Sequence, residues 1–254
     1  MQPDAGTDGG TDGRAGSGTN EGMGAGIEAP TDAGTRTGGL AMKYALDRVF
    51  AAVGLVALSP LLGGVGLWIL LESGRPVILR QLRAGENGVP FRMLKFRTMV
   101  PDAIEAGRLL GLGEDPYGVV PDDPRITRSG RFLRRTSLDE LPQLWNILRG
   151  EMSIVGPRPD LVEQAAHYTP QDSRRLSVRP GITGWSQIQG RDEITWPERF
   201  EHDAWYVENR SLALDAKILL ATFRQLRRRD PAPVEDRMNI ERAQARQRPA
   251  DEAD

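Results

Sequence analysis

Residues 49–71, VFAAVGLVALSPLLGGVGLWILL, form a segment of 23 residues without a charged side chain. A helix rises about 1.5 Å per residue, so an unbroken helix of this length could cross a hydrocarbon core of roughly 30 Å. Ser59 and Pro60 interrupt the stretch near its middle, where proline removes a backbone hydrogen bond and kinks a helix. Each half would then be only about 16 Å long, which is enough to enter one leaflet of a bilayer and return.

Basic residues on both sides of the apolar stretch indicate its topology. Lys43 and Arg48 precede it, and three arginines follow it within residues 75–83. Because positively charged loops stay in the cytoplasm, both ends are expected on that side of the membrane. We therefore predict a re-entrant membrane helix over residues 41–74. A single straight span and a buried core helix of a soluble protein are the alternatives.

Composition excludes several kinds of chemistry. The chain of 254 residues has no cysteine and only two histidines. Disulfide bonds, thiolate zinc sites, a cysteine nucleophile and a three-histidine metal site are therefore ruled out. Any catalysis must use carboxylates, hydroxyls, arginine and lysine.

The charges are segregated along the chain. Residues 1–40 are rich in glycine and acidic, and residues 230–254 are acidic as well, so we predict a disordered polar tail and a mobile C-terminal tail. The body between them is basic, which favours anionic partners such as phosphates or anionic membrane lipids. We expect no nucleic-acid partner, and the oligomeric state stays open.

The body over residues 75–229 predicts a helix-dominated α/β fold with a short β-sheet or hairpin. Alternating, β-branched residues indicate two strands that a glycine-containing turn joins. The strands are expected at 77–81 and 90–99, and helices at 101–111, 127–135, 137–150 and 200–229. The last of these helices has a basic end and suits an interfacial helix on anionic headgroups, although an amphipathic core helix fits its periodicity equally well.

The sequence Ser137-Leu138-Asp139-Glu140 is the sharpest candidate for chemistry. It reads as a helix-capping box, in which both acids would be structural. The surrounding charge favours a second interpretation, because seven cations near two acids exceed what neutralisation requires. These cations are Lys95, Arg97, Arg125, Arg128, Arg131, Arg134 and Arg135.

An excess of arginine beside a helix N-terminus is typical of a phosphate site. A carboxylate held against a bound diphosphate could attack phosphorus, with a divalent cation and arginine relieving the repulsion. The alternative is a solvated basic face against anionic lipid.

Two proline-containing stretches are predicted as ligand loops. Gly156-Pro157-Arg158-Pro159 fixes the backbone around one arginine, and RPGITGW at residues 179–185 does so around another. Either stretch alone is more often a structural corner. His167 and His202 have no partners that suggest catalysis, and we expect both to be structural.

Four stretches in this order resemble one family. KFRTM (95–99), RTSLDELPQLWNILRGEMSIVGPRP (135–159), RPGITGWSQIQGR (179–191) and LDAKIL (214–219) follow an apolar segment that Ser-Pro interrupts. Together they are similar to the bacterial sugar transferases, small monotopic phosphoglycosyl transferases. The resemblance covers roughly residues 43–226 and implies a compact α/β body on the cytoplasmic face of the bacterial inner membrane.

The resemblance also implies a reaction and the residues that perform it. A sugar 1-phosphate would pass from a UDP-sugar to undecaprenyl phosphate with release of UMP, as the first membrane step of glycoconjugate or exopolysaccharide synthesis. Asp139 would be the nucleophile, Glu140 its metal-linked partner, and Mg²⁺ the cofactor held by both. The substrate-binding residues implied are Lys95, Arg97, Pro157, Arg158 and, less directly, Arg179.

The resemblance is closest to the diacetylbacillosamine phosphate transferase type, which implies an N-acetylated amino sugar. Asp192 and Glu193 stand where those members often have Asn-Ala, so glucose and galactose stay open. A non-catalytic, membrane-bound protein that binds nucleotide sugars or acts as a scaffold is the second hypothesis. An ordinary glycosyltransferase is the third, although no convincing Asp-x-Asp motif is present.

Overall fold

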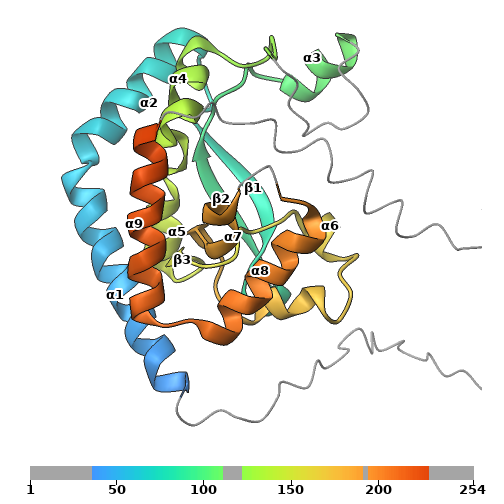
Figure 1. The fold of residues 1–254 in the computed structure, drawn as a ribbon. Helices are drawn as coiled ribbons and strands as arrows, with labels where there is room; N and C mark the ends of the chain where they lie inside the picture. The colour runs from blue at the N-terminus through green and yellow to red at the C-terminus, as the bar shows by residue number, and fades with distance from the viewer. Residues whose placement is uncertain (1–35, 111–121, 191–193, 229–254) are drawn as a thin grey trace, which may run out of the picture.

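The computed structural model describes residues 36–110, 122–190 and 194–228. In these residues helices surround two small sheets, which confirms the prediction of a helix-dominated fold (Figure 1). Both predicted tails, apart from residues 36–40, and most of the loop before residue 125 lie outside the described residues.

The apolar stretch folds as two helices that meet at an angle. Helix α1 (Arg36–Ala57) begins before the predicted boundary at residue 41, and α2 (Ser59–Ser73) follows after one residue. The axes differ by 63°, and the Ser59 hydroxyl donates a hydrogen bond to the Val56 carbonyl. The predicted bend at Ser59-Pro60 is therefore confirmed. Within the described residues no single helix is long and apolar enough to cross a membrane, but the bent pair together has the length and composition for it.

Two short sheets lie beside the helices. Strands β1 (Ile78–Ala84) and β2 (Pro90–Phe96) form the predicted antiparallel hairpin, in which Ile78 pairs with Phe96. The turn between them contains the 3₁₀ helix η1 (Glu86–Gly88). Strands β3 (Ser153–Val155) and β4 (Gly181–Thr183) pair in parallel, which the sequence did not predict. This pairing places the two predicted ligand loops next to each other.

The predicted helices over 101–111 and 127–135 are each present as one helix, the other two predicted helices are divided, and three short helical segments between residues 162 and 189 were not predicted. The predicted helix over 137–150 divides into a 3₁₀ turn and a short helix, and the final helix divides at Arg210 and Ser211. The elements are α3 (Ala103–Leu109), α4 (Arg128–Thr136), η2 (Leu138–Glu140), α5 (Gln143–Arg149), α6 (Val162–Ala165), η3 (Asp172–Ser177), α7 (Trp185–Gln189), α8 (Trp196–Asn209) and α9 (Leu212–Arg228).

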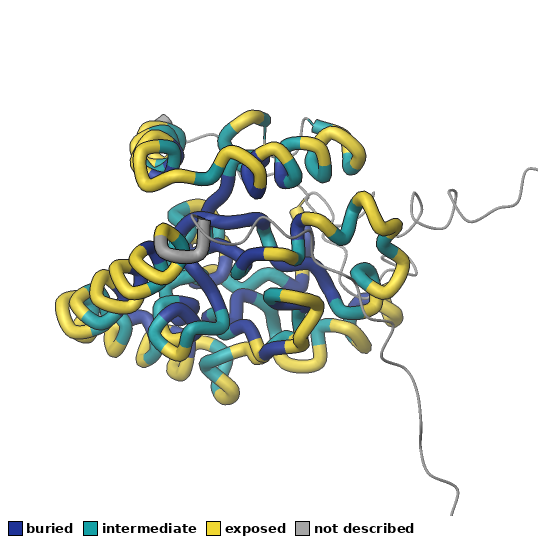
Figure 2. The backbone as a smooth tube through the Cα atoms, turned by 90° about the horizontal axis from the view of Figure 1, so that it is seen from below, coloured by how far each residue is buried: buried dark blue, intermediate teal, exposed yellow. Residues whose placement is uncertain are grey.

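One side of the bent helix pair belongs to the core of the body. Ala51 of α1 is buried in a cluster with residues of β2 and α5. Val65 and Ile69 of α2 are buried in a second cluster with Phe96 of β2 and Leu133 of α4. Buried residues accordingly concentrate in the middle of the body, and the outer helical turns are exposed (Figure 2).

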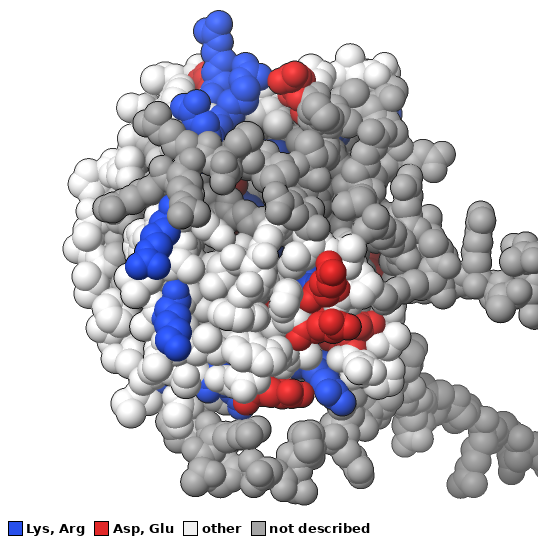
Figure 3. Space-filling view, in the orientation of Figure 1, with Lys and Arg blue, Asp and Glu red and all other residues white. Residues whose placement is uncertain are grey.

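The other side of the pair presents an exposed apolar surface. Val53 and Phe50 of α1 and Leu67 and Leu71 of α2 are all more than half exposed. Figure 3 shows that the surface over α1 and α2 is mostly uncharged, whereas Lys and Arg side chains lie over α9. A contiguous apolar surface of this kind marks an interaction site for a membrane or a partner.

Candidate active site

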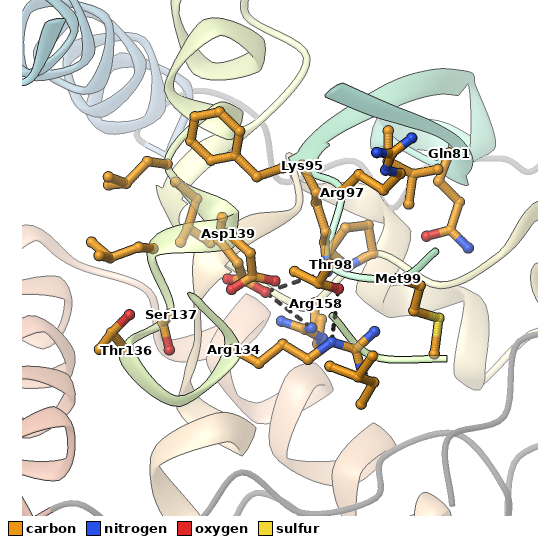
Figure 4. Close-up of a pocket in the computed structure, with 18 of the residues that line it drawn as sticks. Gln81, Lys95, Arg97, Thr98, Met99, Arg134, Thr136, Ser137, Asp139 and Arg158 are labelled. Atoms are coloured by element: carbon orange, nitrogen blue, oxygen red, sulfur yellow. Dashed lines mark hydrogen bonds and ion pairs between the residues drawn. The ribbon is translucent and has the colours of Figure 1, made fainter. Parts of the chain in front are cut away.

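The chain reverses direction at Ser137 and thereby places the Asp-Glu pair. Ser137 ends α4 in the left-handed conformation, with a φ of 55°. Leu138 then packs on the apolar cluster that contains Val65 and Ile69. Asp139 and Glu140, in the 3₁₀ turn η2, line a cavity on the other side (Figure 4).

Glu140 is held by two cations from different parts of the chain. Its Oε1 lies 3.3 Å from Lys95 Nζ of β2 and 3.2 Å from Arg158 Nη2 in the loop after β3. The Ser137 side chain makes no capping hydrogen bond, so the capping-box interpretation is wrong. Burial alone would raise the pKa of Glu140, but Arg158 and Lys95 lower it to about 2. Glu140 is therefore a fixed negative charge.

Asp139 differs from its neighbour because it has no fixed partner. Its side chain forms no hydrogen bond or ion pair with any other residue that the structure describes. Burial and the adjacent Glu140 raise the pKa of Asp139 to about 6, while Lys95, Arg134 and Arg158 act in the opposite direction. The carboxylate is mostly ionised at neutral pH, more basic than an ordinary aspartate, and open to a ligand.

The cavity beside Asp139 has a volume of about 1560 Å³. Ligand pockets usually measure roughly 300–1,000 Å³, so a large organic phosphate fits here. Its polar wall carries Lys95, Arg134 and Arg158. Its apolar wall includes Ile154 and Ile182 and side chains of α9. The cavity therefore combines a place for anionic groups with an apolar surface.

Buried polar contacts position the two cations that hold Glu140. Asn146 of α5 accepts a hydrogen bond from the Leu94 amide at 3.0 Å and donates one to the Arg92 carbonyl at 2.8 Å, which ties α5 to β2 next to Lys95. Arg175 donates a hydrogen bond to the Arg158 carbonyl at 2.8 Å. Pro157 is buried beside Arg158 and restricts its backbone.

Two of the predicted substrate-binding arginines make other contacts. Arg97 lines the cavity, but its Nη2 donates to the Ser73 carbonyl, the Ser73 hydroxyl and the Gly74 carbonyl, each at 2.8 Å. Arg179 does not line this cavity: it pairs with Glu86 at 3.3 Å and lies over the Tyr44 ring at 3.9 Å. The geometry thus supports a bracing role for Arg97 and gives no support to direct substrate contact by Arg179.

Arg134 is one of the seven cations near the Asp-Glu pair, but it is not among the predicted substrate-binding residues. Its Nε donates a hydrogen bond to the Thr98 hydroxyl at 2.8 Å, and its charge lowers the pKa of Asp139 (Figure 4). Arg134 lies in the last turn of α4, five residues before Asp139. That spacing was visible in the sequence, but the reversal at Ser137, which brings the two side chains together, was not.

Asp139 and Glu140 are the residues predicted to hold a magnesium ion. Among the described residues no group of three or more His, Asp or Glu side chains could hold a metal ion. Magnesium, however, often binds through one or two carboxylates together with substrate phosphates. Asp139 and Glu140 fit such an ion when a phosphate supplies further ligands.

Two adjacent carboxylates next to Lys95, Arg134 and Arg158 form an arrangement that suits the binding of phosphate groups. The model of the family described as "Bacterial sugar transferase" matches residues 39–229. The chain belongs to this family, which confirms the resemblance.

Relatives in three bacteria give the match more detail. The chain is 47% identical over 158 residues to the uncharacterized sugar transferase EpsL of Bacillus subtilis (strain 168), which covers 62% of this chain and 73% of EpsL. It is 39% identical over 200 residues to the undecaprenyl-phosphate galactose phosphotransferase of Salmonella typhimurium (75% of this chain, 41% of the relative).

A third relative is the UDP-glucose:undecaprenyl-phosphate glucose-1-phosphate transferase of Xanthomonas campestris pv. campestris. It is 40% identical over 185 residues, covering 69% of this chain and 37% of the relative. The chain thus spans about two fifths of the length of the Salmonella and Xanthomonas relatives, whose names state a sugar. None of the three is named for diacetylbacillosamine, so that subtype stays a prediction.

Proposed function

We propose that this protein transfers a sugar 1-phosphate from a UDP-sugar to undecaprenyl phosphate and releases UMP. The observation that carries the proposal is Asp139, a half-buried carboxylate with no ion pair among the described residues, beside a Glu140 that pairs with Lys95 and Arg158. The names of the Salmonella and Xanthomonas relatives support the same donor and acceptor classes.

The donor diphosphate binds between the cations of the cavity. Lys95 and Arg158 have N–H groups next to Asp139 and Glu140 that can donate hydrogen bonds to the phosphates. Arg134 lies on the wall of the cavity that α4 forms. Arginine forks bind two phosphate oxygens at once and suit this task. Their charges bring phosphorus close to a carboxylate that would otherwise repel it.

In the first step the Asp139 carboxylate attacks the phosphorus that carries the sugar. A bond forms between a carboxylate oxygen and that phosphorus, and the bond from phosphorus to the bridging oxygen of the diphosphate breaks. UMP leaves with the bridging oxygen and the electron pair of the broken bond. The product is a phosphosugar-aspartate. The pKa of about 6 serves this step because the group is both ionised and basic at neutral pH.

In the second step the lipid phosphate takes over the sugar phosphate. An oxygen of undecaprenyl phosphate attacks the phosphorus of the phosphosugar-aspartate, and the bond to Asp139 breaks. The carboxylate is restored and an undecaprenyl diphosphate sugar is formed. Because Asp139 is used in both steps, it needs access to a soluble donor and to a lipid.

Magnesium is proposed as the cofactor, held by Asp139 and Glu140 together with donor phosphate oxygens. When bound, it would neutralise charge that develops on the diphosphate and on the departing UMP. Glu140 keeps its negative charge at neutral pH, because the pKa of this carboxyl lies near 2.

The bent pair of α1 and α2 is proposed as a re-entrant membrane helix with both ends on the cytoplasmic face. The 63° bend, the exposed apolar surface and the flanking bases support this topology over a straight span. The exposed apolar and basic side chains of α9, such as Phe223 and Arg224, extend the contact with anionic lipids. The protein then rests on the cytoplasmic face of the plasma membrane.

The donor sugar is the least determined part of the proposal. The names of the Salmonella and Xanthomonas relatives favour galactose or glucose, whereas the resemblance around residues 179–191 favours an N-acetylated amino sugar. A panel of UDP-sugars, each with undecaprenyl phosphate and Mg²⁺, tests the reaction and the sugar together. UMP release with one sugar supports the proposal. UDP release would indicate an ordinary glycosyltransferase, and no release with any donor would indicate the non-catalytic scaffold.

A further inference from the structure

Glu72 forms a bridge between the bent helix pair and the catalytic segment. It lies near the C-terminal end of α2, and its two carboxylate oxygens accept hydrogen bonds from the amides of Arg128 and Ser129, at 2.8 and 3.0 Å. These amides open α4, where backbone N–H groups have no partner within the helix. The α4 helix is therefore capped from outside by an acid of α2, in addition to its own cap, Thr127.

Apolar contacts also connect α2 with α4 and with the turn that carries Asp139. Ile69 of α2 shares a buried cluster with Leu133 of α4, and Leu138, next to Asp139, packs on the same cluster. The rings of Trp68 and Phe132 also meet, with centroids 5.7 Å apart. The catalytic turn thus has α2 directly behind it.

The start of α4 is also fixed against the end of β2. The Thr127 amide donates a hydrogen bond to the Thr98 carbonyl at 3.1 Å. Gly130 packs so closely that a Cβ atom there would lie 2.0 Å from the same carbonyl oxygen. The first turn of α4 is therefore held by Thr98 on one side and by Glu72 of α2 on the other, and these contacts together set the direction of the helix and the position of its last turn, next to Asp139.

We propose that Glu72 is a positioning residue that sets the depth of Asp139 relative to the lipid surface. The inference rests on the proposed function, in which α2 enters the bilayer and Asp139 reacts with a lipid. It assigns Glu72 to the second step, the transfer to the lipid phosphate.

The two substrates differ in how they tolerate a change of depth. A soluble donor can adjust its position to a shifted turn, and Lys95 and Arg158 are ion-paired with Glu140 and can still bind its phosphates. The phosphate of a polyprenyl acceptor is held near one depth because its chain is anchored in the bilayer. A displaced catalytic turn therefore impairs the lipid step far more than the donor step.

A depth measurement tests the inference without using activity. Because the chain has no cysteine, Thr136→Cys at the end of α4 can carry a single spin label. The label is compared in vesicles of phosphatidylethanolamine and phosphatidylglycerol with and without Glu72→Ala, by collision with oxygen and with a polar nickel chelate. A change of depth caused by Glu72→Ala is expected. An unchanged depth would overturn the inference.

Kinetics then separate the two steps. With Glu72→Ala, kcat/KM for undecaprenyl phosphate in bilayers should fall roughly fivefold. This factor corresponds to about 1 kcal/mol, the free energy that one helix cap typically contributes. The single-turnover release of UMP from the donor alone should stay within about twofold of the wild type. A water-soluble, two-isoprene phosphate should react equally with both proteins, because it is not held at a fixed depth.

A matched control and the contrary outcomes complete the test. Glu201→Ala removes an exposed acid of α8 and should change neither depth nor rates. Equal losses with both acceptors, or an equal loss in the donor step, would show general damage and overturn the inference. A wild-type protein that releases no UMP would refute the proposed function instead, and the label depth would still decide the role of Glu72.

Discussion

Two clusters of charge in this molecule, one buried and one half-buried at the cavity, have opposite character. In the body, Arg175 pairs with Asp160 and, at 2.6 Å, with Asp203. Tyr168 and Ser186 donate further hydrogen bonds to these two acids. In the cavity, Lys95 and Arg158 both pair with Glu140, and Asp139 is left with no partner in the described chain.

The difference separates structural from reactive charge. Burying a charge is costly unless hydrogen bonds and ion pairs compensate, and the Arg175 cluster meets this condition on every side. At the Asp-Glu pair, ion pairs with Lys95 and Arg158 compensate the charge of Glu140, whereas Asp139 has no ion pair among the described residues. The result is one carboxylate with a pKa near 2 and one near 6, a separation that is typical of groups with distinct roles in one site.

Replacing the nucleophile should have the largest effect. Asp139→Asn keeps the shape but cannot attack phosphorus, so UMP release should fall on the order of 10³-fold or more. The label from a donor with radioactive sugar phosphate should disappear as well. Because the carboxylate is destabilised by burial and by Glu140, thermal stability should be equal or higher. A label that persists would place the nucleophile elsewhere.

Removing the central cation of the structural cluster should mainly affect stability. Arg175→Met leaves Asp160 and Asp203 buried without their counter-charge, and the free energy of unfolding should fall by about 3–5 kcal/mol. Urea denaturation in detergent measures the loss, with the exposed Arg92→Met as the matched control. If the loss were no larger than in the control, the contrast between the two clusters would not hold.

Removing a cation from the cavity should mainly affect the donor. Arg158→Ala takes away one of the two partners of Glu140 and a charge for the diphosphate. Because hydrogen bonds to charged groups contribute about 1.5–3 kcal/mol, kcat/KM for the UDP-sugar should fall roughly tenfold to a hundredfold. Steady-state kinetics with Arg92→Ala as control checks this. An unchanged KM for the donor would argue against Arg158 as a phosphate ligand.

The pH dependence should show the smallest effect. The rate of the first step should rise with pH through about 6 and then level off, because only the ionised carboxylate of Asp139 attacks. Arg158 lowers the pKa of Asp139, so Arg158→Ala should move the midpoint to higher pH. Single-turnover UMP release as a function of pH measures both midpoints. A shift to lower pH would mean that another group titrates.

Local patterns in the sequence account for much of the fold. The β1–β2 hairpin, α4 and the bend at Ser59-Pro60 follow from alternation, periodicity and proline, which act over a few residues. The capping box was wrong because Ser137 takes a left-handed conformation that ends α4. A short motif is compatible with two backbone paths, and its neighbours in space decide between them.

Residue types in the sequence limit the groups that this protein has for its chemistry: no thiols, two histidines, carboxylates such as Asp139 and Glu140, and many arginines behind an apolar stretch. Only the tertiary structure decided which acid is paired, because Lys95 and Arg158 reach Glu140 from segments that lie far apart in the chain. It also directed Arg97 to the end of α2 and Arg179 to Tyr44. Residue type and spacing are local, whereas the pKa of a buried group depends on everything packed around it.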